Sequence, residues 1–263
     1  MDFATTKEYS KEDIRKVQME LLSMGEAVCN ILCKYDIPHF ISFGTLLGAV
    51  RHQGFVPWDD DFDLFLFDDT YDQAMLHLEE ELPSHLLVHG HKNDPIYFPA
   101  WNRVVNTKTK VEDGGLYNPD NNMLKYQCIG VDMYRLKKMG KHQIRRYKLE
   151  EALKFFQRKH DFGIISDQTY SDESQKLQMA LKSAIVEEES STDKSEVFMF
   201  MITLKDPINP EDLLPLKMYK FEGEEFYGPK DHSPLLESTY GDYMKIPEYK
   251  NRKPHYLKVI FYE

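Results

Sequence analysis

The sequence predicts an α+β fold, in which a mixed β-sheet is flanked by helices and followed by a C-terminal helical extension. Strand and helix patterns alternate between about residues 36 and 136, and the composition becomes helical from 141 to 186. With 263 residues, 41% of them hydrophobic, the chain can bury a sizeable core. We expect a single domain over residues 1–263, with its core at about 36–136 and a helical and C-terminal part at about 141–263.

The first elements follow from capping and periodicity. Ser10 precedes acidic residues, and an apolar stripe then recurs at helical spacing, so the pattern predicts a long amphipathic helix over Ser10–Lys34. The stripe consists of Ile14, Val17, Leu21, Val28, Leu32 and Tyr35. His39–Phe43 reads as a short buried strand, and Gly44-Thr45 as a glycine turn that leads into a short helix ending near Arg51.

The remaining elements alternate along the chain. The apolar run Phe62–Phe67 predicts a strand and Thr70–Leu82 a helix, with Tyr71, Ala74, Met75 and Leu78 facing inward. Further strands are expected at 86–88, 97–105 and 129–136. The polar connection 106–125 contains the turn sequences Gly114-Gly115 and Asn118-Pro119.

The second half is predominantly helical at first. Lys141–Val186 predicts two helices separated by Gly163 and Asp167, followed by a charged, Ser-rich loop over Glu187–Lys194. Near the end, Tyr219–Tyr227 predicts a hairpin and Leu235–Tyr240 a short helix.

Composition argues against several classes of protein. The net charge is −11, so a broad basic surface for nucleic acid is not expected. No targeting peptide is visible, and the longest apolar run, Val197–Leu204, is less than half of the roughly 20 residues that a membrane-spanning helix needs. Cys29, Cys33 and Cys128 lack a Cys-x-x-Cys pair, which favours a reducing compartment and core packing over a zinc site. We therefore expect a cytoplasmic protein without a transmembrane segment.

A run of carboxylates is the strongest chemical signal. Asp59, Asp60, Asp61 and Asp63 directly precede or begin an apolar strand, and in a strand Asp61 and Asp63 point to the same side. Asp132 stands alone in the apolar segment Ile129–Tyr134, where an unpaired charge would be costly. Clustered oxygen ligands favour Mg²⁺ or Mn²⁺, with a phosphate substrate completing the coordination. A solvated acidic turn is the alternative for this segment.

The segment before the carboxylates suits phosphate. Gly44-Thr45 offers backbone N–H groups at the start of a short helix, and Arg51 follows two turns later, so that amides and a guanidinium can hold phosphate oxygens.

These motifs together resemble those of a known family. Gly44-Thr45, Asp61-Phe62-Asp63-Leu64 and Val131-Asp132-Met133 are similar to the three-part signature of the nucleotidyltransferase superfamily. More narrowly, residues 43–52 and 54–63 closely resemble the LicD family of phosphocholine transferases, relatives of the fukutin group, and the segment Tyr240–Pro247 followed by Arg252 and His255 resembles that family's closing motif. One departure is Tyr134-Arg135-Leu136, where the family usually has a proline.

The resemblance implies a nucleotidyltransferase-like fold and the metal-dependent transfer of a phosphoalcohol, in the first instance phosphocholine from CDP-choline. The expected acceptor is a hydroxyl of a cell-surface glycan precursor, such as a lipid-linked oligosaccharide of lipopolysaccharide or teichoic acid, reached at the inner face of the membrane. Asp61, Asp63 and Asp132 are the expected catalytic and metal-binding residues. The expected substrate-binding residues are Gly44, Thr45, Arg51, Trp58, Asp60, Trp101, Arg103, Tyr240 and Lys245.

Individual roles within this set differ. Arg51 and Arg103 are candidates to clamp phosphate oxygens, and Trp58 or Trp101 can stack on cytosine or on the quaternary ammonium of choline. Tyr97 and Tyr243 are further candidates for such an aromatic cage. Lys245, Arg252 and His255 are placed near the site by the resemblance alone.

Two other functions stay open. A nucleotidyltransferase would move NMP from an NTP to a small acceptor and release pyrophosphate, and an inactive nucleotide-binding domain would bind without turnover. A second metal site at His85, His89 and His91 is not expected, because the sequence places no carboxylate with them.

Overall fold

The computed structural model describes residues 5, 9–97, 99–112, 123–200 and 206–263 of the 263-residue chain. The described residues form a six-stranded sheet with the order β1-β2-β6-β4-β3, and β7 pairs with the far end of β6. Its strands are β1 (His39–Ile41), β2 (Phe62–Phe67), β3 (Leu86–His89), β4 (Asn102–Asn106), β6 (Gly130–Gly140) and β7 (Glu196–Met199). β2 and β6 are parallel and the other pairs are antiparallel, so the predicted mixed sheet is confirmed.

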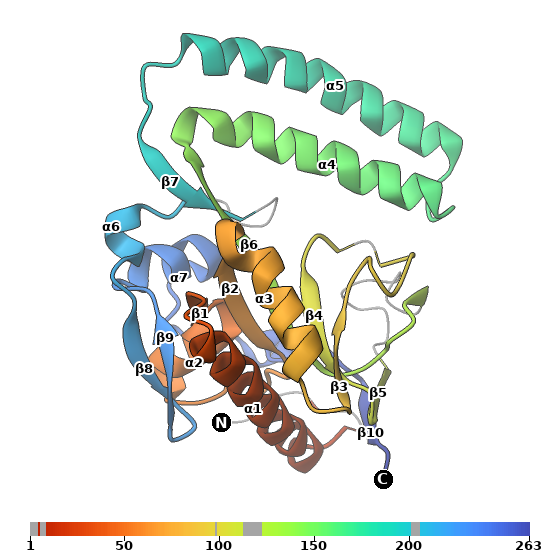
Figure 1. Cartoon of the computed structure of the whole chain (residues 1–263), viewed down its shortest axis with the longest axis vertical. Coiled ribbons are helices and arrows are strands. Elements are labelled where there is room, and N and C mark those ends of the chain that lie inside the picture. The colour runs from red at the N-terminus through yellow and green to blue at the C-terminus, as the bar shows by residue number, and fades with distance from the viewer. Residues whose placement is uncertain (1–4, 6–8, 98, 113–122, 201–205) are drawn as a thin grey trace.

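Helices flank this sheet, as the predicted α+β class requires (Figure 1). Helices α1 (Lys11–Lys34) and α3 (Asp68–Glu81) pack against each other and against β6. The Ser10 side chain accepts a hydrogen bond from the Asp13 amide, and the predicted apolar stripe of α1 is buried from Ile14 to Leu32. The inward face predicted for α3 is also buried.

The helical part lies between β6 and β7. Helices α4 (Ile144–Asp161) and α5 (Asp167–Ser190) form a hairpin beyond the end of β6, as Figure 1 shows, after the short 3₁₀ helix η2 (Lys141–Gln143). The prediction of two helices in this region is confirmed. None of the helices in the described part of the chain has the length and apolar character needed to span a membrane.

The chain from residue 210 onward folds back beside the main sheet. After α6 (Pro210–Leu213), the predicted hairpin is confirmed as β8 (Lys217–Phe221) and β9 (Glu224–Gly228), which lies beside β1. The predicted short helix is confirmed as α7 (Ser233–Tyr240), which contacts α2 (Phe43–His52). The chain then passes through η3 (Tyr249–Asn251), and β10 (Lys258–Phe261) pairs with β5 (Thr109–Glu112).

Several predicted boundaries are wrong. Helix α2 begins at Phe43, so Gly44 and Thr45 lie in its first turn and not in a preceding turn. The strand expected over 97–105 begins only at Asn102, β6 continues to Gly140, and residues 187–190 are helical because α5 runs to Ser190.

Parts of two predicted segments lie outside the described residues. The polar connection 106–125 contains β5, which sequence reasoning missed, and its Gly114-Gly115 and Asn118-Pro119 turns are not described. Of the apolar run Val197–Leu204, the first three residues belong to β7 and those from 201 on are not described. Cys29 and Cys128 are buried as expected, whereas Cys33 is exposed.

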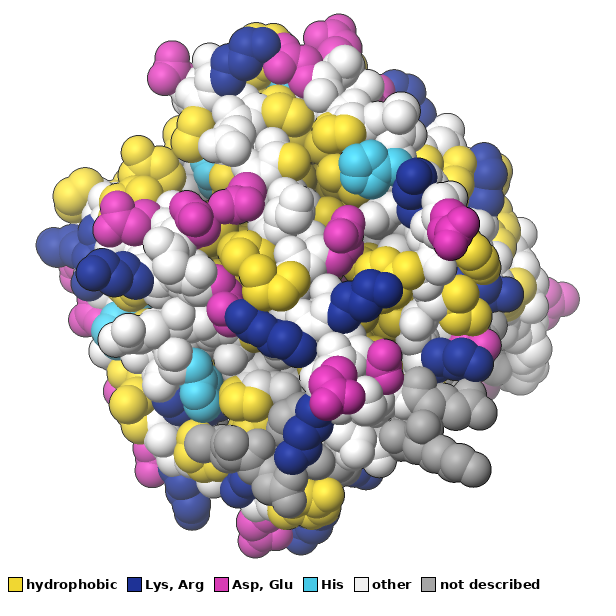
Figure 2. Space-filling model, turned by 90° about the horizontal axis from the view of Figure 1, so that it is seen from below, with side chains coloured by type: hydrophobic (Ala, Val, Ile, Leu, Met, Phe, Trp, Pro, Cys, Tyr) yellow, Lys and Arg dark blue, Asp and Glu magenta, His cyan; other side chains and the backbone are white. Residues whose placement is uncertain are grey.

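The surface mixes both signs of charge. On the face shown in Figure 2, the Lys and Arg side chains of the described residues are interspersed with Asp and Glu, and no broad basic patch stands out.

Candidate active site

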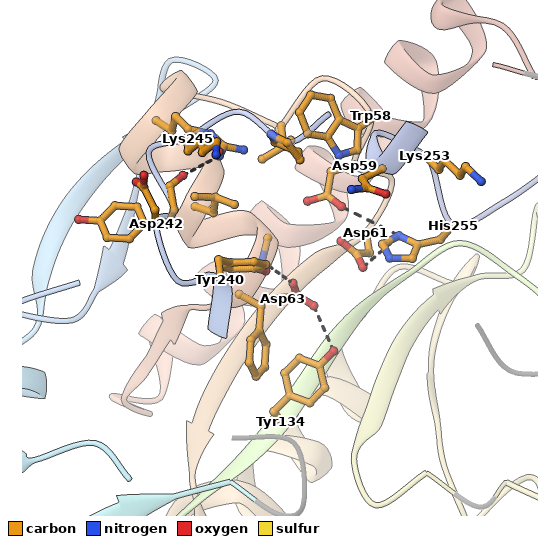
Figure 3. Close-up of a pocket in the computed structure, with 18 residues that line it drawn as sticks. Trp58, Asp59, Asp61, Asp63, Tyr134, Tyr240, Asp242, Lys245, Lys253 and His255 are labelled. Atoms are coloured by element: carbon orange, nitrogen blue, oxygen red, sulfur yellow. Dashed lines mark hydrogen bonds and ion pairs between the residues drawn. The ribbon is translucent and has the colours of Figure 1, made fainter. Parts of the chain in front are cut away.

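A pocket of about 420 Å³ lies where the loop before β2 meets α2, β6 and the segment that follows α7 (Figure 3). Its walls come from parts of the chain that are up to about 200 residues apart in sequence. It is lined by Phe43, Gly44, Leu47, Arg51, Val56, Trp58, Asp59, Asp61, Asp63, Tyr134, Tyr240, Asp242, Tyr243, Lys245, Pro247, Asn251, Lys253 and His255.

Three carboxylates share one wall of this pocket. Asp59, Asp61 and Asp63 all line it, whereas Asp60 does not. This is the alternation expected of extended backbone, in which every second side chain points to the same side. The extended segment therefore presents three acids to the pocket and turns the fourth into the protein.

Asp60 is fully buried and accepts hydrogen bonds from both ends of the chain. Its Oδ1 accepts from the backbone N of His255 at 2.7 Å, and its Oδ2 accepts from the backbone N of Tyr256 at 3.2 Å and from the Tyr9 hydroxyl at 3.1 Å. Asp60, which was expected to bind substrate, does not line the pocket, and its oxygens hold the C-terminal segment in place.

Asp63 is held on both carboxylate oxygens. Its Oδ2 accepts from the Gly44 amide at 3.2 Å, and its Oδ1 accepts from the Tyr134 hydroxyl at 3.2 Å. The Thr45 hydroxyl accepts from the backbone N of Asp63 at 2.9 Å. Thr45 is buried and does not line the pocket, so its observed role is to fix the start of β2 against α2 rather than to contact a ligand there.

Gly44 is needed because Asp59 approaches it closely. A Cβ atom at this position would overlap with Oδ2 of Asp59. Absence of a side chain therefore lets the Asp59 carboxylate lie over the first turn of α2.

The carboxyl groups of Asp59, Asp61 and Asp63 all have raised pKa values. Burial, followed by the charge of Asp61, raises the pKa of Asp59 well above its ordinary value, and burial with the charges of Asp61, Asp132 and Asp59 does the same to the pKa of Asp63. Burial is also the largest cause of the raised pKa of Asp61, which Asp132 reinforces and His255 opposes. Positive charge at this wall would relieve all three carboxylates.

His255 supplies one such charge. Burial alone would lower the pKa of His255, but Asp61, Asp60 and Asp59 outweigh it and raise this pKa to about 12. The Nδ1 atom lies 3.0 Å from Oδ1 of Asp60, 3.4 Å from Oδ2 of Asp61 and 4.0 Å from Oδ1 of Asp59. Figure 3 shows the His255 ring beside the side chains of Asp59 and Asp61.

The donor set fits a metal ion. Asp59, Asp61 and His255 each offer a ligand atom, and these atoms lie within 4.8 Å of one another. Oδ1 of Asp61 is buried and has no hydrogen-bond partner in the described part of the chain. A buried carboxylate oxygen without a partner is costly, and a cation would satisfy it.

Asp132 is engaged elsewhere. It lies opposite Asp63 in the parallel pairing of β2 and β6, yet it is not among the described residues that line the pocket. Its Oδ1 lies 2.9 Å from Nε of Arg103 and accepts a hydrogen bond from Nε1 of Trp101 at 2.8 Å. Arg103 also donates to the Tyr256 hydroxyl. The structure therefore joins Asp132, Arg103 and Trp101 into a buried network behind the acidic wall, and none of the three lines the pocket itself.

Several other predicted residues line the pocket, whereas Tyr97 and Arg252 do not. Trp58, Tyr240 and Lys245 are on its walls, as is Arg51. Nη1 of Arg51 donates to the backbone oxygen of Tyr243 at 2.6 Å, so this side chain also fastens the segment after α7 to α2.

Sequence reasoning missed five lining residues with polar side chains, namely Asp59, Tyr134, Asp242, Asn251 and Lys253. The alternation that paired Asp61 with Asp63 would have included Asp59 and excluded Asp60 if extended two residues back. Tyr134 follows Asp132 by two residues in β6 and so shares its face in the same way. No local pattern places Asn251 or Lys253, because their positions depend on how the C-terminal segment folds back.

Three histidines, His85, His89 and His91, lie in or near β3. Among the described residues, none of His85, His89 and His91 belongs to a group that could hold a metal. The view that no carboxylate joins them is wrong, because buried His89 pairs through Nε2 with Asp94 at 2.8 Å.

Fold and site together describe an α+β protein in which strand β2 and the extended segment before it present three carboxylates to a pocket suited to a divalent cation. Residues 36–109 match the family described as LicD/FKTN/FKRP, nucleotidyltransferase domain. Over 268 aligned positions, covering 97% of this chain and 99% of the relative, the sequence is 23% identical to the lipopolysaccharide cholinephosphotransferase LicD of Haemophilus influenzae. The resemblance of the chain to the LicD family is thereby confirmed.

Two shorter matches concern uncharacterized proteins. The chain is 40% identical to one from Rickettsia prowazekii and 38% identical to one from Rickettsia typhi, each over 68 residues. These matches cover 26% of this chain and 24% and 21% of the respective relatives.

Proposed function

We propose that the protein transfers a phosphoalcohol, in the first instance phosphocholine from CDP-choline, to a hydroxyl of a glycan such as lipopolysaccharide. The observation that carries this proposal is the wall formed by Asp59, Asp61 and Asp63, with a buried oxygen of Asp61 left unpartnered. The similarity to a lipopolysaccharide cholinephosphotransferase over nearly the whole chain supports the choice of substrate class.

A divalent cation, Mg²⁺ or Mn²⁺, is part of the proposal. Asp61 and Asp63 would hold it together with Asp59, which takes the place at the pocket that sequence reasoning gave to Asp132. When bound, it would neutralise the carboxylates and stabilise the negative charge of the diphosphate. Asp132 then contributes through the charge that it adds behind the wall.

Other residues that line the pocket can bind the remaining parts of the donor. Lys245 and Lys253 line the pocket, and neither has a carboxylate partner among the described residues, so both can bind phosphate oxygens of the donor and of the leaving CMP. The aromatic side chains of Trp58 and Tyr240 offer flat surfaces for cytosine or for a quaternary ammonium.

The reaction itself is a substitution at phosphorus. The acceptor oxygen bonds to the phosphorus that carries choline, the bond from this phosphorus to the CMP oxygen breaks, and CMP leaves with the electron pair. The proton of the acceptor hydroxyl passes to a carboxylate of the acidic wall. Positioning and charge stabilisation supply most of the catalysis in such transfers.

The identity of the released product, CMP or pyrophosphate, tests the proposal. The purified protein is incubated with Mg²⁺ or Mn²⁺, a lipopolysaccharide acceptor and either CDP-choline or CTP, and the released nucleotide is measured. We expect CMP from CDP-choline, and loss of this activity in Asp61→Asn and Asp63→Asn, while Glu225→Gln on the exposed side of β9 retains it. Pyrophosphate released from CTP would instead indicate nucleotidyl transfer, and metal binding without turnover of either donor would indicate a binding domain.

A further inference from the structure

His255 reaches the acidic wall from the far end of the chain. It follows η3 and precedes β10, 192 residues after Asp63. Asp60 fixes this segment, because it accepts from the backbone N of His255 and of Tyr256 and contacts the His255 ring at Nδ1. In metal sites a carboxylate commonly holds the ring nitrogen that does not bind the ion, so the contact of Asp60 with Nδ1 leaves Nε2 of His255, once deprotonated, as the ligand atom.

The distances around the ring suit a shared ion. Nδ1 of His255 lies 3.4 Å from Oδ2 of Asp61 and 4.0 Å from Oδ1 of Asp59. Asp59, Asp61 and His255 each offer a ligand atom, and these atoms lie within 4.8 Å of one another, so side-chain adjustments can bring them to one ion.

We propose that His255 is a nitrogen ligand of the metal that Asp59 and Asp61 bind. This inference rests on the metal-dependent function proposed above and adds a donor of a different kind to it. A mixed set of carboxylates and imidazole favours a first-row transition ion over Mg²⁺, which prefers oxygen ligands and retains much of its water. The site therefore selects Mn²⁺ or a similar ion when both are available.

Pulsed electron paramagnetic resonance of bound Mn²⁺ tests the ligand directly. One equivalent of Mn²⁺ is added to the full-length protein, and the coupling of the electron spin to directly bound ¹⁴N is recorded. We expect the ¹⁴N signal in the wild type and in His85→Asn, a matched control just before the edge strand β3, and its loss in His255→Asn. A wild-type spectrum of bound Mn²⁺ without coordinated ¹⁴N would overturn the proposal.

Metal affinity gives a second, independent reading. If His255 is a ligand, His255→Asn weakens Mn²⁺ binding at least tenfold in calorimetric titration and weakens Mg²⁺ binding less. If His255 instead serves as a cationic partner of the acids, its removal strengthens the binding of both ions, because a competing positive charge is lost. The second result contradicts the proposal.

The two proposals fail in different ways. Mn²⁺ that binds the wild type, requires Asp61 and supports CMP release, but has no ¹⁴N coupling, refutes the role of His255 and leaves the proposed function standing. If the wild type does not bind Mn²⁺ or Mg²⁺ at all, both proposals are wrong. Circular dichroism and thermal unfolding of His255→Asn confirm that the variant is folded in each case.

Discussion

The hydroxyl of Tyr134 on β6 donates a hydrogen bond to Oδ1 of Asp63 on the neighbouring strand β2, while the Gly44 amide donates to Oδ2 of the same carboxylate. Asp63 is 3% exposed, so water contributes little to its orientation. These two donors therefore fix the plane of the carboxylate before any ligand enters the pocket.

Removing only the Tyr134 hydroxyl should loosen that carboxylate. Tyr134→Phe keeps the ring, which packs against Phe43, Phe65, Trp101 and Phe200, so we expect little change in melting temperature. We expect kcat/KM for phosphoalcohol transfer to fall about tenfold, or about 1.4 kcal/mol, as for the loss of a hydrogen bond to a charged group. Steady-state kinetics and metal titration measure this, and unchanged values for both would show that the hydroxyl has no role in the site.

Adding a methyl group at Gly44 should disturb the site more than the fold. The new Cβ of Gly44→Ala would displace the end of the Asp59 side chain, which can rotate away, rather than backbone. We therefore expect metal binding to weaken by tenfold or more while the thermal unfolding midpoint stays within a few degrees of the wild type. Calorimetry and thermal unfolding on the same samples test this, and intact metal affinity would mean that Asp59 is dispensable.

Replacing Asp60 should act through structure. In Asp60→Asn, one acceptor oxygen becomes an NH₂ group that faces the backbone amides of residues 255–256 or the Tyr9 hydroxyl. The buried donors left without a partner should cost about 1–3 kcal/mol of unfolding free energy. Urea denaturation measures this loss, and limited proteolysis should cut near residue 255 sooner than in the wild type. A variant of wild-type stability that has lost donor binding would restore Asp60 as a substrate contact.

The raised carboxyl pKa values predict how stability depends on pH without metal. A carboxyl whose pKa is higher in the folded than in the unfolded state stabilises the protein fully below its unfolded pKa of about 4, and this contribution is lost as pH rises through the folded value. The raised pKa of His255 acts in the same direction at higher pH. We expect the melting temperature of the chelator-treated wild type to fall between pH 4.5 and 8 more than that of Asp59→Asn. Parallel curves for the two proteins would contradict the assignment.

We expect Arg135 to have no role in catalysis. It belongs to the segment Tyr134–Leu136, which lacks the proline expected from the family resemblance. Its guanidinium pairs with Asp68 and Asp72 on α3 and lies 4.3 Å from the centre of the Tyr71 ring, outside the residues that line the pocket. We expect Arg135→Leu to lower stability by about 1 kcal/mol at most and to leave donor preference and kcat/KM unchanged. A comparison of CDP-alcohols with both proteins tests this, and an altered donor preference would refute it.

Local patterns predicted the elements that carry the site. Capping by Ser10, the apolar run of β2 and the turn between β8 and β9 depend on residues close in sequence, so they are readable without the fold. The same rule of alternation located Asp61 and Asp63 on one side of the chain. Boundaries were less accurate where packing decides, as at β4, which begins at Asn102 and not at residue 97.

What the patterns could not predict depends on distant contacts. The direction of the Asp132 carboxylate is set by Arg103 and Trp101 on the neighbouring strand β4 and just before it, and the burial of Asp60 is set by Tyr9 and by residues 255–256. In both cases an isolated motif predicted a ligand contact, whereas the partner that occupies the carboxylate lies elsewhere in the chain. Assignments of charged residues are therefore least secure where a buried cation or amide can compete with the substrate.

The hydrogen bonds that converge on Asp60 tie the site to the order in which the polypeptide is made. Residues 59–63 are translated well before His255 and Tyr256, whose backbone amides anchor the last wall of the pocket through Asp60. A growing chain therefore carries the acidic segment without the wall that completes the pocket until residues 255–256 have been added. A chain that stops before residue 255 lacks both amide donors and the His255 ring, so the acidic segment stays without this wall.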